Sequence, residues 1–253
     1  AQIDALLELS GLRQELRQAP EIVAREALQQ GGPMPPERRE ALAQVLRQAY
    51  DPQLLEADVR TALGRLLAGP GGRRDLERAL ALLRSPLARR MDRLEEAAAS
   101  PAAQEELERF AASPEARRAS PARRALIRRL MKAQQAAEAL LDLQEATFRG
   151  MVAAFNPGLP PERRLEGAEL EQVTREMRRR ARPQVERYLE TAMLYTYREA
   201  SDEELARYAE LLERPAAQRV HRLLLRALEE AMGEAARRAG QGMRRLQGVK
   251  GSA

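Results

Sequence analysis

The five residues Pro35-Pro36-Glu37-Arg38-Arg39 occur again without change as Pro160-Pro161-Glu162-Arg163-Arg164, at an offset of 125 residues. Two further pairs of segments match at offsets of 131 and 129 residues: Asp51-Pro52-Gln53-Leu54 with Arg182-Pro183-Gln184-Val185, and Leu82-Leu83-Arg84-Ser85-Pro86 with Leu211-Leu212-Glu213-Arg214-Pro215. Recurrence at a nearly constant period indicates an internal duplication. We therefore expect two tandem repeats that contain the same succession of elements.

The residues that fill these repeats favour helices. Ala, Leu, Arg, Glu and Gln dominate, aromatic residues make up only 3% of the chain, and Trp is absent. These are strong helix formers, and the sequence lacks the β-branched and aromatic runs that are typical of strands. Apolar residues recur at helical spacing, as in Leu76, Ala79, Leu80 and Leu83. The prediction is an all-α fold of two tandem helical-bundle repeats.

The expected domain boundaries follow the repeats and the distribution of charge. Residues 1–112 form the first repeat, 113–126 a basic linker rich in Ser-Pro, 127–236 the second repeat and 237–253 a flexible basic tail. The whole chain carries a net charge of +5, and its excess positive charge lies around the linker and in the tail, since both repeats are mildly acidic.

Prolines and glycines predict where helices begin and end. A helix over residues 3–18 is expected to precede a second one that starts at Pro20 and ends at Gly31-Gly32-Pro33. A single long helix is expected over residues 121–155, and a bend or restart at Pro183. We further expect Pro86 and Pro215 to occupy equivalent positions. The burial of Leu83, Met91 and Leu94 should then mirror that of Leu212, Val220 and Leu223.

Two segments resemble a known bacterial family. Leu6-Leu7-Glu8-Leu9-Ser10-Gly11-Leu12 is similar to the opening helix of the family named domain of unknown function 2059, and residues 197–219 resemble its closing motif through Asp202-Glu203-Glu204-Leu205, Leu211-Leu212 and Pro215-Ala216-Ala217-Gln218-Arg219. Residues 84–90 resemble that motif as well. Leucine pairs stand in this chain where the family usually has aromatic pairs. The resemblance implies an exported, helical protein without an assigned activity.

The sequence offers little to catalysis or metal binding. His221 is the only histidine, and its spacing places it near the edge of a buried helical face or in solvent, which favours a structural role. Cysteine is absent, and no nucleotide-binding or hydrolase motif occurs. Asp202-Glu203-Glu204 is typical of a helix start, where carboxylates are favoured. We therefore expect no enzyme activity, no catalytic residues, no cofactor and no metal.

Two groups of arginines are candidates for binding anions. One lies before and in the predicted long helix, and the other precedes Pro183 at spacings that bring most of its members onto one helical face. The candidate anion-binding residues are Arg123, Arg124, Arg128, Arg175, Arg178, Arg179 and Arg182. Nucleic acid is disfavoured as a partner, because aromatic residues for base stacking do not accompany these arginines.

These observations lead to two functional expectations. The first is a non-enzymatic helical envelope protein that binds a protein, peptide or lipid partner in a groove between the repeats. The alternative is an anion-binding module for acidic lipid, lipopolysaccharide or nucleic acid. No apolar run of about 18 residues occurs, so no transmembrane segment is expected. The chain starts at Ala1-Gln2, as after removal of a signal peptide or trimming for expression, and we expect a periplasmic or secreted location.

Overall fold

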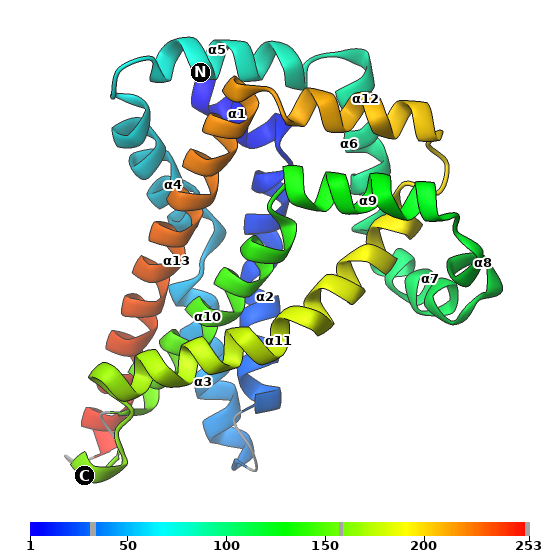
Figure 1. Cartoon of the computed structure of the whole chain (residues 1–253). Helices are drawn as coiled ribbons and strands as arrows, with labels where there is room; N and C mark the ends of the chain where they lie inside the picture. Colours follow the sequence, from blue (N-terminus) through cyan, green and yellow to red (C-terminus); the bar gives the residue numbers. More distant parts are fainter. Residues whose placement is uncertain (31–33, 157–158, 251–253) are drawn as a thin grey trace. The chain divides into compact units, whose positions relative to one another are not determined.

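A computed structural model describes residues 1–30, 34–156 and 159–250, and within these residues the chain is helical and contains no strand (Figure 1). The all-α prediction is confirmed. The first half of the chain contains α1 (Gln2–Leu9), α2 (Leu12–Gln30), α3 (Pro36–Ala49), α4 (Pro52–Leu67), α5 (Gly72–Leu83), α6 (Pro86–Ala98), α7 (Pro101–Ala112) and α8 (Pro114–Arg118). The second half contains α9 (Pro121–Ala133), α10 (Ala136–Phe155), the 3-10 helix η2 (Pro161–Arg163), α11 (Gly167–Thr196), α12 (Asp202–Leu212) and α13 (Pro215–Lys250).

Ser-Pro pairs start four of these helices, as the sequence predicts. In each case the serine hydroxyl accepts a hydrogen bond from the backbone N–H three residues later, and the proline occupies the first helical position. The proline lacks an N–H that would otherwise remain unpaired there. The four capping residues are Ser85, Ser100, Ser113 and Ser120.

The first helix break lies at Ser10-Gly11, whereas the sequence analysis placed it at Pro20. Gly11 has a φ of +73°, a left-handed conformation that glycine adopts without a steric penalty. Pro20 lies inside α2. Leu16 and Val23 are buried on either side of it, and their packing outweighs the loss of one helical hydrogen bond. The predicted helix end at Gly31-Gly32-Pro33 lies outside the described residues.

The predicted long helix over residues 121–155 is wrong. The chain leaves the helical conformation at Gln134-Gln135, and α9 and α10 are separate helices. Gln135 has a φ of 50°, which is uncommon for a residue with a side chain. Glutamine is a good helix former, so the sequence contains no local signal for this break.

The two copies of the repeated pentapeptide adopt different structures. Pro36 starts the 14-residue helix α3, whereas Pro161 starts only the short helix η2. The difference comes from what holds the next residues. The Asn156 side chain accepts a hydrogen bond from the N–H of Leu165 at 3.1 Å and donates one to its carbonyl at 2.9 Å, which ties that residue outside any helix.

Two further segments are helical where the sequence suggested an interruption. Helix α11 continues through Pro183, so the restart expected there does not occur. A flexible tail was expected after residue 236, and in the structure α13 continues through this segment to Lys250. Ala239 and Met243 are buried on this part of α13, which explains why it is held in a helix. Residues 251–253 lie outside the described residues.

Contacts divide the chain into two compact units, each assembled from three stretches. Unit 1 contains residues 1–12, 66–141 and 180–223. Unit 2 contains residues 13–65, 142–179 and 224–253. These boundaries differ from those expected from the sequence, because each unit takes segments from both halves of the chain.

The core of unit 1 lies among α6, α9, the end of α11 and α12. Helix α12 packs against α9 and α6, and α1 packs against α5 (Figure 1). The buried side chains of this core are Ala88, Met91, Ile127, Leu130, Met131, Met193, Leu194, Tyr197, Ala200, Leu205, Tyr208, Ala209 and Leu211.

The core of unit 2 brings α13 close to helices of the first half and to α10. A Cβ at Gly150 in α10 would lie 3.2 Å from Cβ of Ala236, and one at Gly242 would lie 2.8 Å from Val45. A side chain at either position would force the neighbouring side chain to shift. The buried residues of this unit include Val23, Leu42, Leu46, Tyr50, Leu55, Val59, Leu63, Ala227, Ala231, Met232, Ala235 and Met243.

Candidate functional site

Three of the predicted anion-binding arginines lie on α9 and bind groups of their own unit. Arg123 donates hydrogen bonds to the carbonyls of Tyr197 at 2.6 Å and Ala200 at 2.8 Å, and it also pairs with Asp202 at 2.7 Å. It thereby satisfies carbonyls at the end of α11, where a cation is favoured. The other two, Arg124 and Arg128, both pair with Glu190 of α11.

The arginines of α11 are paired in a similar way. Arg178 pairs with Asp142 of α10 in unit 2, and Arg182 pairs with Glu138 of α10 in unit 1 at 2.6 Å. Arg179 pairs with Glu176 of its own helix at 2.7 Å. Arg175 is exposed. A hydrogen bond from Arg149 lowers the pKa of the Glu171 carboxyl, and the positive charge of Arg175 lowers it further.

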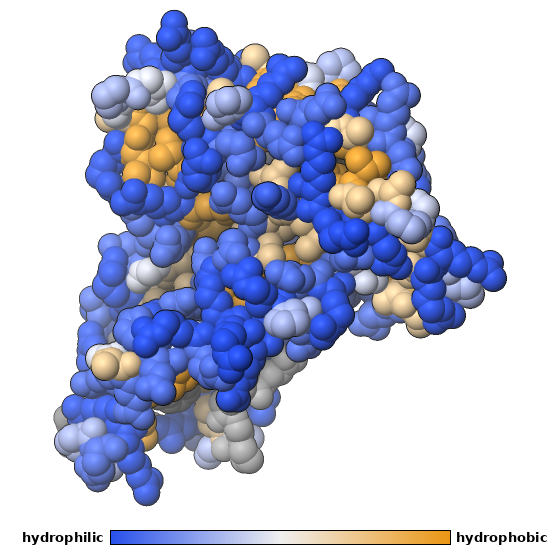
Figure 2. Space-filling view, viewed as in Figure 1, coloured by the Kyte–Doolittle hydropathy of each residue, from blue (hydrophilic) through white to orange (hydrophobic). Residues whose placement is uncertain are grey.

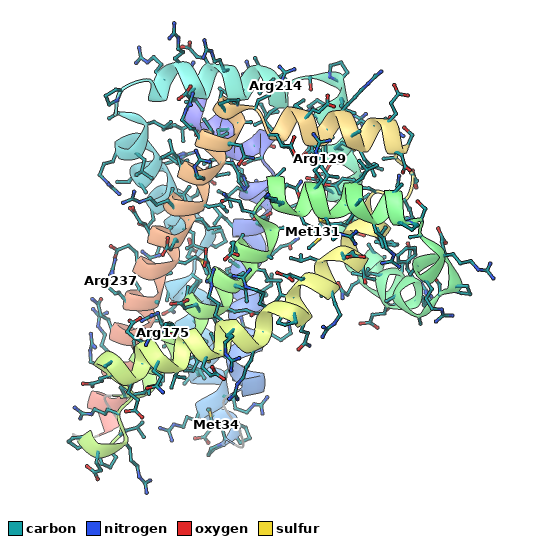
Figure 3. The ribbon with its side chains drawn as sticks, in the orientation of Figure 1. Met34, Arg129, Met131, Arg175, Arg214 and Arg237 are labelled. Atoms are coloured by element: carbon teal, nitrogen blue, oxygen red, sulfur yellow. The ribbon has the colours of Figure 1, made fainter. Side chains whose placement is uncertain are left out.

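Six of the seven predicted arginines therefore hold carboxylates of the same chain. Five of these ion pairs join two elements of the chain, and the pair of Arg179 lies within α11. A neighbouring example is Arg129 of α9, which binds Glu213, the residue directly after α12, through two hydrogen bonds of 2.8 and 2.6 Å (Figure 3). Much of the positive charge seen in the sequence is thus compensated locally.

A buried polar cluster lies in unit 1. Tyr197 and Tyr208 both direct their hydroxyls to Oε1 of Glu95, at 2.5 and 3.2 Å, and Gln134 donates to the Tyr197 hydroxyl at 3.3 Å. Burial raises the pKa of both tyrosines well above the usual value, and the nearby Glu95 charge raises it further. Both phenols are therefore neutral donors at neutral pH. They satisfy a carboxylate next to an apolar core, which is a structural role.

His221 also has a structural environment. Its Nε2 lies 2.6 Å from the carbonyl oxygen of Gln134, at the break between α9 and α10. Burial lowers the pKa of the imidazole, so the neutral form is favoured and Nε2–H donates to that carbonyl. This position agrees with the predicted place at the edge of a buried face.

The acidic segment at the start of α12 forms a capping box. The Ser201 hydroxyl accepts from the N–H of Glu204 at 3.1 Å, and the Glu204 carboxylate accepts from the N–H of Ser201 at 2.8 Å. This pairing satisfies two backbone donors and explains the residues without a ligand. In the part of the chain that the structure describes, no group of three or more acidic or histidine side chains could hold a metal ion.

The candidate binding site is a charged groove in unit 2, between α4 and α13. It has a volume of about 660 Å³. One wall is the polar face of α4, and the other is a face of α13 on which residues recur three or four positions apart. The lining residues are Asp58, Thr61, Ala62, Arg65, Arg226, Glu229, Glu230, Gly233, Glu234 and Arg237.

Charges of both signs line this groove. Arg65 of α4 pairs with Glu230 of α13, and Glu230 also lies 3.6 Å from Arg226. Arg237 projects from α13 and donates from Nη2 and Nε to Glu234 (Figure 3). These guanidinium groups are largely exposed, and exposed ion pairs contribute little to stability. A partner could replace them at low cost.

Three of the residues that line the groove are small. Gly233 lies inside α13, and a Cβ built on it would meet no atom within 4 Å. Glycine inside a helix is less favourable than alanine by about 1 kcal/mol. Packing within the chain therefore gives no reason for glycine here, unlike at Gly150 and Gly242. Ala62 and Thr61 on the opposite wall are also small.

None of the groove residues is among the arginines predicted to bind anions. The available signal was the set of charged positions 226, 229, 230, 234 and 237, which share one face of a helix with Gly233. Recognising a groove required knowing that α4 lies opposite this face. Such a relationship between distant segments cannot be derived from local spacing.

Comparisons with known proteins do not identify relatives, since no protein-family model, no curated protein and no solved structure matches the chain. None of the helices in the described ranges is long and apolar enough to cross a membrane.

Proposed function

We propose that this chain is a non-enzymatic helical binding protein that holds a polypeptide partner in the groove between α4 and α13. The single observation that carries this proposal is Gly233, a helix-interior glycine at the groove surface whose space no residue of the chain occupies. The groove lies within unit 2, and its lining residues come from both the first and the second half of the chain.

The chemistry of the lining favours a polypeptide over a lipid. Three arginines and four carboxylates surround the groove, and buried acyl chains would leave these charges without water or partners. A peptide with charged side chains of both signs can replace the exposed pairs of Arg65 and Glu230 with equivalent ones. On the face drawn in Figure 2, hydrophilic residues predominate, which also favours a polar partner.

A non-enzymatic role is proposed because the reactive side chains have structural partners. His221 is held by the Gln134 carbonyl, and the buried tyrosines hold Glu95. The lining of the groove contains no histidine or cysteine that could serve as a nucleophile or general base.

The proposal includes an origin and a location. We propose that the chain arose by duplication of a helical repeat and that it is a divergent member of the exported family named domain of unknown function 2059. Its site of action would then be the periplasm or the outside of the cell. The matching sequence segments support this part of the proposal, and mass spectrometry of the native protein would test whether a leader has been removed.

Binding should be measured with a library of short charged peptides, using fluorescence anisotropy at low salt. We expect peptides of mixed charge to bind and Gly233→Leu to abolish this binding by filling the groove. Gly64→Leu is the matched control, because Gly64 lies inside α4, meets no atom within 4 Å and is outside the groove. Binding that survives Gly233→Leu, or equal losses in both variants, would disprove the groove as the site.

The anion-binding alternative retains support from the exposed arginines Arg128 and Arg179, whose side chains are 55% and 74% exposed although both are paired. Attraction to phosphates would fall steeply with salt. Vesicles of acidic phospholipid, lipopolysaccharide and duplex DNA should be tested at low and high salt, with the double variant Arg128→Glu, Arg179→Glu. A salt-dependent signal that this variant weakens would favour the alternative over the peptide groove.

A further inference from the structure

Two ion pairs of unit 1 are reciprocal. Arg219 of α13 donates from Nε and Nη2 to Asp75 of α5, at 2.6 and 2.7 Å. Arg90 of α6 lies with its Nε 2.8 Å from Glu204 of α12. Glu204 follows Asp75 by 129 residues, and Arg219 follows Arg90 by the same number. The carboxylate of each half therefore pairs with the equivalent arginine of the other half.

This pattern is what a two-fold symmetric dimer produces. In such an interface, residue i of one subunit contacts residue j of the second, and residue j of the first contacts residue i of the second. The same offset of 129 relates Leu82-Leu83 to Leu211-Leu212 in the sequence. The ion pairs therefore provide an independent observation.

The helices that carry these residues also correspond in burial. Leu76, Ala79 and Leu80 are buried in α5, and the residues 129 positions later, Leu205, Tyr208 and Ala209, are buried in α12. Pro86 and Pro215 both occupy the first position of the next helix. The three predicted pairs agree as well: Leu83 and Leu212 are half-buried, Met91 and Val220 are buried, and Leu94 and Leu223 are half-buried.

The opening helices of the two halves correspond too. Leu6 and Leu7 of α1 are buried, and so are Leu130 and Met131 of α9, at an offset of 124. At the same offset, the left-handed residue Gly11 corresponds to the left-handed Gln135. Helix α1 packs against α5 just as α9 packs against α12. The unexpected break at Gln135 is thus the counterpart of the one at Gly11.

Neither half supplies a complete core by itself. Met91 of the first half is fully buried among residues of the second half, and Glu95 of the first half accepts hydrogen bonds from Tyr197 and Tyr208. In unit 2, Arg238 of α13 donates to Asp58 of α4 at 2.7 Å and to the carbonyl of Ala49 at 2.9 Å.

We infer that the two halves of the chain are each other's binding partners, joined in unit 1 by a pseudo-two-fold interface like that of a homodimer. The surface consists of α5 and α6 in one half and of α12 and the start of α13 in the other. This inference rests on the duplication proposed above and does not depend on any ligand of the groove. Continuity of the chain between α8 and α9 is then unnecessary for the folded state.

The test uses the full chain with a protease site inserted between Ala119 and Ser120, which lie between α8 and α9. After cleavage of the folded protein, the two fragments should elute together from a sizing column at the volume of the uncut chain and melt in one transition. Separate elution, or one melting transition for each fragment, would overturn the inference. The experiment contains no peptide, so its result does not depend on whether the proposed groove binds one.

Charge reversals test the reciprocity. Arg90→Glu and Arg219→Glu should each raise the dissociation constant of the cleaved fragments, by roughly tenfold or more and to similar extents. Asp75→Arg should restore association in the Arg219→Glu protein. Arg207→Glu is the matched control, because Arg207 pairs with Glu203 of its own helix at 2.6 Å. Equal effects of Arg207→Glu and the two interface variants would contradict the proposed contact.

Discussion

The hydroxyl of Tyr197 lies 2.5 Å from Oε1 of Glu95, a residue 102 positions earlier in the sequence. Tyr197 is only 1% exposed, so its hydroxyl relies on this contact and on Gln134. Tyr197→Phe should lower the free energy of unfolding by about 1–3 kcal/mol, because a partly buried acceptor loses a donor. Urea denaturation measures this change. A variant as stable as the native protein would show that the contact is unimportant.

Local signals predicted much of the helical architecture. Ser85 and Ser120 lie directly before prolines, and both cap helices because capping depends only on neighbouring residues. The break at Gln134-Gln135 was missed because glutamine carries no such signal, and the His221 contact that accompanies it comes from a distant helix. Identical pentapeptides at Pro35 and Pro160 diverged because Asn156 holds the residue after the second copy.

The candidate site was less predictable than the fold. Arginines at helical spacing on α11 suggested an anion site, but the sequence could not show that carboxylates of α10 lie opposite Arg178 and Arg182. Similarly, the polar face of α13 becomes one wall of a groove only because α4 faces it. Such pairings depend on tertiary structure.

Removing a helix cap should have a measurable effect. The Ser120 hydroxyl accepts a hydrogen bond from the N–H of Arg123 at 3.0 Å. Ser120→Ala should therefore destabilise the protein by about 1 kcal/mol, whereas Ser120→Asp should retain most of the stability. Thermal unfolding followed by circular dichroism checks both variants. Equal melting temperatures for the alanine and aspartate variants would contradict the capping role.

Tyr50 should make the protein sensitive to alkaline pH. Burial raises the pKa of its hydroxyl to about 12, although the nearby Arg238 acts in the opposite direction. Since the unfolded tyrosine ionises near pH 10, the stabilisation is present below pH 10 and is lost as the pH rises toward 12. Between pH 10 and pH 12, we expect the free energy of unfolding of the native protein to fall by about 2–3 kcal/mol more than that of the Tyr50→Phe variant. Parallel pH profiles for the two proteins would refute this assignment.

His221 should have the opposite pH dependence. Burial lowers the pKa of His221 in the folded protein. Below the usual imidazole pKa, the unfolded chain therefore binds a proton more readily than the folded protein does. Stability should therefore decrease as the pH falls below about 6.5, and His221→Gln should reduce this decrease. Urea midpoints at pH 7 and pH 5 measure the difference. The prediction fails if both proteins lose the same stability on acidification.

Amide hydrogen exchange of the intact Met91→Ala variant tests whether the two halves of the chain build one core together. We expect this substitution to lower the free energy of unfolding by about 2–5 kcal/mol. Met91 is 0% exposed and belongs to the first half, yet it packs in the core that contains Ile127 and Leu205. We predict faster exchange in α9 and α12 of the second half. Leu55 is a fully buried residue of the first half that belongs to unit 2. The control variant Leu55→Ala should therefore increase hydrogen exchange in α9 and α12 less. Increased exchange confined to residues 1–112 in Met91→Ala would contradict shared cores and indicate two independent tandem repeats.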